Sequence, residues 1–249
     1  MSGHSKWATT KHRKGAQDRA RAKLFAKLIR AVEVAVREGG ADAASNAALR
    51  TAYQKARDGS VPLDTIDRAI KRASGDLDGV RYEAITYEGY GPGGVAIIVE
   101  TLTDNRNRTS PEIRNIFSKN NGNSAEPGAV SWQFDRKGSI EVPGSLDEES
   151  LLETVMEVGG ENLTSNGENF LVTTEATETA AIREALERAG IKVLSSDLIL
   201  IPQHFVAVTD EGEAKKILRL MEALDDHDDV QSVYANFDIP DAILATYEG

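Results

Sequence analysis

Apolar residues recur at helical spacing in the first third of the chain. Between positions 17 and 38 the spacing is three to four residues, and the members are Leu24, Phe25, Leu28, Ala31, Val32, Ala35 and Val36. Gly39 and Gly40 end this pattern, and similar spacing predicts two more helices over 43–57 and 62–73. The segment 1–79 is therefore expected to form a small helical domain.

The pattern changes to that of strands at about residue 82. Segment 95–102 reads VAIIVETL, which is apolar and rich in β-branched residues, and 82–87 predicts a strand before it. The glycine-rich segment 89–94 between them matches G-x-G-x-x-G, a pattern found in dinucleotide sites. Because a strand follows it instead of a helix, no helix N-terminus would receive a pyrophosphate, and we interpret it as a turn.

The rest of the middle region predicts a helix, a loop and a strand. Ser110 is expected to cap a helix that begins at Pro111. Segment 120–128 is polar and rich in Gly and Asn, which indicates a loop, and 130–134 predicts a short strand.

The order of elements in the second half predicts a further domain. Between 138 and 202 the pattern reads β-α-β-β-α-β, which is the ferredoxin-like plan. The tail adds a strand, a helix and a strand at 205–208, 213–224 and 230–236, and these should complete the domain that precedes the insertion. The predicted fold class is α+β, with a helical domain at 1–79, a split α+β domain at 80–137 plus 203–249, and an inserted α+β domain at 138–202.

Charge is distributed very unevenly along the chain. The whole chain has a net charge of −11, yet its first thirty residues hold nine Lys or Arg and one acid. Residues 138–249 hold six bases and twenty-four acids, a net charge of −18. A dense cationic segment neutralises phosphates, whereas the acidic half repels a polyanion, so the N-terminal end is expected to face nucleic acid.

The candidate nucleic-acid contacts lie in this N-terminal segment. Trp7 and His12 add rings that stack on bases, and the first helix carries a row of cations opposite its apolar stripe. The candidates are Lys6, Trp7, Lys11, His12, Arg13, Lys14, Arg19, Lys23, Lys27 and Arg30. The alternative interpretation is a solvated, disordered terminus followed by a solvated basic helix face.

Two further candidates, Arg106 and Arg108, follow the second strand in the segment DNRNR. Arginines beside a helix N-terminus suit a phosphate; alternatively they pair with nearby acids. We expect Arg108, which is nearer the predicted helix start, to be the phosphate ligand, and Arg106 to be structural.

Little in the composition indicates catalysis, a cofactor or a membrane. There is no cysteine, no apolar run long enough for a bilayer, and no signal-peptide pattern, so we expect a cytoplasmic protein. No arrangement of residues predicts a catalytic site, so we expect no enzyme activity. The run of Asp and His at 225–229 contains metal-ligand types but is more typical of a solvated turn, and no metal or cofactor is expected.

Several motifs resemble the YebC/PmpR family. They are GHSKW at 3–7, HRK at 12–14, QD at 17–18, YEGYGPGG at 87–94 and LTDNRNRT at 102–109. Their order covers essentially the whole chain, which departs from the family's usual residues at 8–10 and 124–127. The resemblance implies a helical domain followed by two α+β domains, cytoplasmic location, no enzyme activity, and nucleic-acid contacts at Lys6, Trp7, Lys11, His12, Arg13 and Lys14.

Family members are described in two ways, as DNA-binding transcriptional regulators and as translation factors that act on the ribosome and ease stalling at proline-rich stretches. The partner is therefore expected to be DNA or ribosomal RNA, with no membrane partner. The third helix carries Asp64 and Asp67 near its start, where a recognition helix would meet base edges, and this weakens sequence-specific reading of the major groove. An acidic body with one cationic extension suits an RNA-walled site among basic proteins, and both targets stay open.

Overall fold

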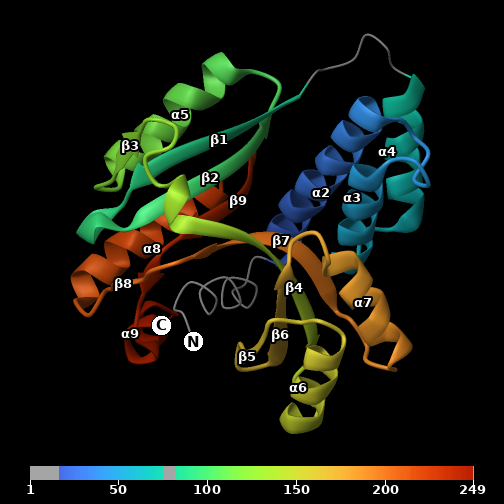
Figure 1. Cartoon of the computed structure of the whole chain (residues 1–249). Coiled ribbons are helices and arrows are strands. Elements are labelled where there is room, and N and C mark those ends of the chain that lie inside the picture. The colour runs from blue at the N-terminus through green and yellow to red at the C-terminus, as the bar shows by residue number, and fades with distance from the viewer. Residues whose placement is uncertain (1–16, 76–81, 249) are drawn as a thin grey trace. The chain divides into compact units, whose positions relative to one another are not determined.

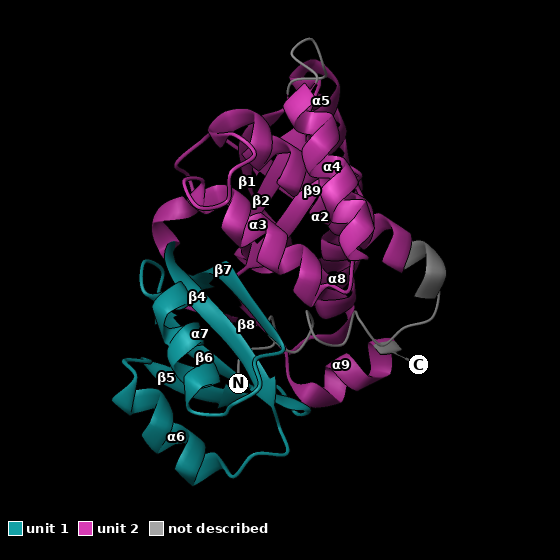
Figure 2. Ribbon diagram, turned by 90° about the vertical axis from the view of Figure 1, so that its right-hand side faces the viewer, with its two compact units in different colours: residues 1, 5–13, 134–203 teal, residues 2–4, 14–133, 204–249 magenta. Residues whose placement is uncertain are grey.

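The computed structural model describes residues 17–75 and 82–248, with side chains from 21–75 and 82–247 (Figure 1). The described residues form two compact units, one made of 134–203 and the other of the remaining segments (Figure 2). No helix among the described residues is both long enough and apolar enough to cross a bilayer.

Three helices form the first part of the larger unit, namely α2 (Gln17–Gly39), α3 (Ala47–Asp58) and α4 (Leu63–Gly75). Their apolar stripes share one core, whose members are Leu28, Val32, Ala35, Val36, Leu49, Ala56, Val61, Ile66 and Ala73. The buried Asn46 joins the first two helices, because its side chain accepts from Leu49 N at 3.0 Å and donates to Ala35 O at 2.7 Å. One residue thereby caps α3 and fixes it to the end of α2.

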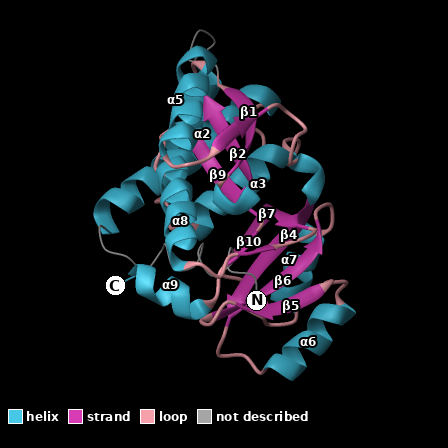
Figure 3. Ribbon diagram, turned by 90° about the vertical axis from the view of Figure 1, so that its left-hand side faces the viewer, coloured by secondary structure: helices cyan, strands magenta, loops and turns pink. Residues whose placement is uncertain are grey.

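The second part of the larger unit is an α+β structure around a four-stranded antiparallel sheet (Figure 3). Its strand order is β3-β1-β2-β9, and the strands are β1 (Glu83–Tyr90), β2 (Ala96–Thr103), β3 (Asn123–Ala125) and β9 (Val230–Ala235). Helices α5 (Arg106–Lys119) and α8 (Glu211–Asp225) pack on it. The 3-10 turns η1 (Pro92–Gly94) and η2 (Ser131–Gln133), the parallel pair β8 (Val206–Ala207) and β10 (Phe237–Asp238), and α9 (Asp241–Glu248) complete this part.

Gly89 shows how closely helix α5 approaches the sheet. A Cβ atom at this position would lie 2.6 Å from Cε1 of Phe117, and Phe117 is fully buried. Any side chain at 89 would displace that ring, so the glycine is needed for packing here.

The smaller unit has the ferredoxin-like topology. It contains β4 (Phe134–Pro143), α6 (Glu148–Glu157), β5 (Asn162–Ser165), β6 (Asn169–Glu175), α7 (Thr179–Arg188) and β7 (Ser195–Pro202). The strand order is β5-β6-β4-β7 with antiparallel neighbours throughout. Alternate residues of β4 and β6 share one core with both helices, namely Ile140, Val142, Leu151, Val155, Phe170, Val172, Ile182 and Leu186.

The predicted fold class is confirmed: a three-helix N-terminal part precedes an α+β region with two antiparallel sheets. The predicted insertion at 138–202 lies within the smaller unit, 134–203. That 1–79, 80–137 with 203–249, and 138–202 fold as three separate domains stays a prediction.

Several predicted boundaries were wrong. Helix α5 begins at Arg106 instead of Pro111, because Asn105 caps it by accepting from Arg108 N at 3.1 Å. Helix α3 begins at Ala47, after its cap, instead of at 43. The predicted loop at 120–128 contains β3, and helix α9 was not predicted.

The predicted strand at 130–134 was also wrong, and a buried carboxylate explains the difference. Glu88 accepts from the backbone N–H groups of Gly128, Val130 and Ser131 at 2.6–2.9 Å, which folds this segment into a turn before β4 begins. Burial would raise the pKa of Glu88, but these hydrogen bonds outweigh it, and the pKa lies below its usual value.

Candidate nucleic-acid interface

The structure describes only some of the predicted contact residues. Those of the N-terminal segment lie outside the described residues, namely Lys6, Trp7, Lys11, His12, Arg13 and Lys14. Arg19 belongs to helix α2, but its side chain is outside the described part. Lys23, Lys27 and Arg30 follow along the same helix, and Arg106 and Arg108 lie in the first turn of α5.

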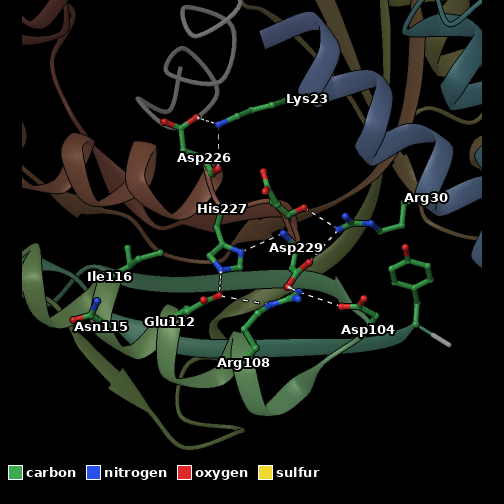
Figure 4. Close-up of a pocket in the computed structure, with 12 residues that line it drawn as sticks. Lys23, Arg30, Asp104, Arg108, Glu112, Asn115, Ile116, Asp226, His227 and Asp229 are labelled. Carbon is green, nitrogen blue, oxygen red and sulfur yellow. Dashed lines mark hydrogen bonds and ion pairs between the residues drawn. The ribbon is translucent and has the colours of Figure 1, made fainter. Parts of the chain in front are cut away.

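The cations of α2 contact an acidic segment far along the chain, residues 225–229, which is called the acidic segment below. Lys27 donates to the backbone oxygen of Asp225 at 2.8 Å, and its Nζ lies 3.5 Å from the carboxylate of the same residue. Lys23 donates to the backbone and side-chain oxygens of Asp226 at 3.2 and 3.1 Å (Figure 4). Both lysines therefore lie on the C-terminal end of helix α8.

Arg30 reaches deeper into the same region. Its Nη1 lies 2.8 Å from the backbone oxygen of Asp228, 3.2 Å from that of Leu102 and 3.3 Å from the carboxylate of Asp229. The guanidinium also lies over the ring of Tyr82, 5.3 Å from its centroid. These contacts join helix α2 to strand β2 and to the turn before β9 in the same unit.

Asp229 lies at the centre of the network, and its side chain is only 4% exposed. Its Oδ2 accepts from Arg108 at 2.7 Å, and the buried hydroxyls of Thr109 and Thr103 lie 2.7 and 3.1 Å away. Burial would raise the pKa of Asp229, but these hydrogen bonds outweigh it and lower the pKa below its usual value. The same hydrogen bond and charge raise the pKa of Arg108.

A cavity of about 950 Å³ opens beside these residues. Its lining includes Lys23, Arg30, Arg108 and His227, together with the carboxylates of Asp104 and Glu112. His227 accepts from the backbone N–H of Asp229 through Nδ1 at 3.1 Å, and its Nε2 lies 2.9 Å from Glu112. Figure 4 shows both contacts of the ring, and acceptance through Nδ1 places the proton of a neutral imidazole on Nε2. The described residues contain no group of three or more ligand-type side chains arranged for a metal ion.

Of the two arginines of DNRNR, the one that makes structural contacts is not the one that we expected. Arg108 is the structural one, with ion pairs to Asp229 at 2.7 Å and Asp104 at 3.1 Å. Arg106 is exposed and has no ion pair within the part of the chain that the structure describes. The expectation that Arg106 is structural was wrong, because the helix begins five residues earlier and aims Arg108 at Asp229. Phosphate binding by either arginine stays a prediction.

Separate alanine substitutions test this arrangement. Arg108→Ala is expected to lower the free energy of unfolding by about 1–3 kcal/mol, since it leaves a buried carboxylate short of a partner. Arg106→Ala, its matched control, should change stability by less than about 0.5 kcal/mol, as exposed positions do. Urea unfolding of both variants measures this difference, and equal losses would contradict the assignment.

Sequence reasoning missed the pairing between α2 and the acidic segment. Both partners were visible, as a row of cations and as four aspartates around His227, but they lie about two hundred positions apart. Complementary charge is the signal that links them. Charge alone does not identify which of the forty acids of the chain pair with the cations of α2.

Comparison with known proteins defines the family. Residues 5–76 match the profile described as the TACO1/YebC protein N-terminal domain, and 82–237 match that of the TACO1/YebC second and third domain. The chain belongs to the TACO1/YebC family, as its motifs indicated.

Relatives in other organisms are similar over nearly their whole length. A probable transcriptional regulatory protein of Halothermothrix orenii is 50% identical over 247 residues, covering 98% of each chain. One of Streptomyces avermitilis with the same description is 51% identical over 246 residues, again 98% of each. The crystal structure of a conserved hypothetical protein from Aquifex aeolicus matches with a TM-score of 0.84 and 44% identity, over 90% of this chain and 93% of that one.

Proposed function

We propose that this protein is a non-enzymatic regulator of gene expression that binds nucleic acid through its basic N-terminal part. The observation that carries the proposal is the charge asymmetry, with nine Lys or Arg against one acid in the first thirty residues of an acidic chain. Such a segment neutralises phosphates, and the repulsion of the acidic half orients the molecule on a polyanion. The names of the relatives, probable transcriptional regulatory proteins, support this role.

DNA is the first candidate target, with transcription as the regulated step. The contacts proposed are those of the N-terminal segment and of α2, together with Arg106, an exposed cation in the first turn of α5. Phosphate contacts of this type position a protein without reading sequence, so modest sequence preference is expected.

Ribosomal RNA is the second candidate, and helix α4 favours it. Its first turn carries Asp64, which pairs with Arg68 at 2.8 Å, and Asp67 is exposed one turn further on. An acidic helix start does not suit the major groove of DNA, because base edges there are surrounded by phosphates. In this alternative the protein is a ribosome-associated translation factor that eases stalled, proline-rich synthesis, and its acidic half faces basic ribosomal proteins.

Two assays on the same lysate distinguish the two targets. The tagged full-length chain is followed by ribosome co-sedimentation through sucrose and, in parallel, by pull-down with sheared genomic DNA. The DNA candidate predicts recovery with DNA and absence from ribosomes that have been treated with DNase. Recovery with ribosomes alone favours the translation role, and recovery with neither contradicts the proposed function.

A further inference from the structure

The lysines of α2 meet a surface that resembles a phosphate backbone in its chemistry. Their ammonium groups contact the carboxylate oxygens of Asp225 and Asp226 and donate to the backbone oxygens of the same two residues. Those backbone oxygens belong to the last turn of α8, which carries no basic residue of its own. The negative end of a helix dipole and two carboxylates thus offer closely spaced anionic acceptors, as neighbouring phosphates do.

The three contacts differ in how firmly they are held. The Lys23–Asp226 pair is open to solvent, with side chains 47% and 76% exposed. Lys27 and Asp225 are 14% and 15% exposed, and Asp229, the partner of Arg30, is only 4% exposed. Exposed pairs contribute little and exchange readily, whereas a buried carboxylate does not give up its partners cheaply. Lys23 is therefore the readily released contact, whereas Lys27 and Arg30 are held more firmly.

We infer that the acidic segment is an intramolecular competitor of nucleic acid, which must displace Asp225 and Asp226 from Lys23 and Lys27 before phosphates can occupy those lysines. This inference rests on the proposed function and adds its regulation. The free protein holds part of its cationic helix covered, which lowers its affinity for any polyanion. A long or densely charged nucleic acid offers more phosphates in a row and competes better than a short one.

Neutralising the acidic segment tests the inference. The variant Asp225→Asn with Asp226→Asn removes the competing charges, and α8 is expected to stay folded because negative charge at a helix C-terminus is unfavourable. The control is Glu38→Gln with Asp67→Asn. It makes the same change in net charge at exposed positions of the three-helix part, which also carries Lys23 and Lys27. Binding is measured by anisotropy with a labelled RNA strand and a DNA duplex of about 20 nucleotides or base pairs, at about 50 mM salt.

The neutralised variant is expected to bind about tenfold more tightly than the control, and the difference should shrink as salt rises. In a double-mutant cycle, replacing Lys23 and Lys27 by Gln should remove that gain, since no lysine is then released. If the wild type shows no binding and the neutralised variant does bind, that result supports the inference even more strongly.

Two results overturn it, and they are distinguishable. If the neutralised variant and the control gain affinity equally, or if the gain survives the loss of both lysines, the competitor role is wrong while the proposed function stands. If neither wild type nor any variant binds RNA or DNA, the proposed function fails and the inference fails with it.

Discussion

Replacement of Asp229 by Ala is expected to lower the free energy of unfolding by about 3–5 kcal/mol. The carboxylate is almost fully buried and holds Arg108, Arg30 and two buried threonine hydroxyls, so its removal leaves several polar groups without their partner. The neighbouring Asp228→Ala makes the same charge change at an exposed side chain and should cost less than about 0.5 kcal/mol. Urea unfolding measures both, and similar values for the two would contradict the central place of Asp229.

The same carboxylate gives stability a defined pH dependence. Because the pKa of Asp229 is lower in the folded protein than its ordinary value, its contribution is fully present above the ordinary value. It is lost as the pH falls toward and through the folded value, where the carboxylate takes up a proton. The Asp229→Ala variant should therefore show a smaller loss of stability on acidification than the wild type, with the loss from Glu88 still present.

Element types followed from local pattern, whereas several element ends did not. The alternation between 138 and 202 suffices for the ferredoxin-like order, because each helix and strand there shows its own period. The prediction took Ser110 alone as the cap of α5, although Asn105 is also a residue type that caps helices. Tertiary contacts decide between them, because Thr109 and Arg108 reach Asp229 only when the helix already includes them.

The sequence predicted which cations of the candidate site share one helix face, but not which residues they contact. Helical spacing put Lys23, Lys27 and Arg30 on one face of α2, and they do share one set of partners. What they face depends on how β9 returns beside β2 and brings the end of α8 to them. No local pattern carries that information, because the contact spans about two hundred residues.

Deletion of residues 1–15 is expected to weaken binding to nucleic acid about a hundred- to a thousandfold at about 0.1 M salt. The segment carries four cations and no acid, namely Lys6, Lys11, Arg13 and Lys14. Each cation that neutralises a phosphate releases condensed counterions, so the loss grows as salt falls. A full-length control makes the same charge change on exposed cations elsewhere, through replacement of Lys119, Arg188, Lys192 and Lys216 by Gln.

The salt dependence of that binding tests the central claim most directly. The logarithm of the association constant is measured against the logarithm of salt concentration for wild type, the deletion and the full-length control. Four lost phosphate contacts predict that the slope of the deletion is smaller by about 2.8 to 3.6, at about 0.7 to 0.9 for each contact, while the control keeps the wild-type slope. An unchanged slope in the deletion, or an equal decrease in both variants, would contradict binding through the N-terminal segment.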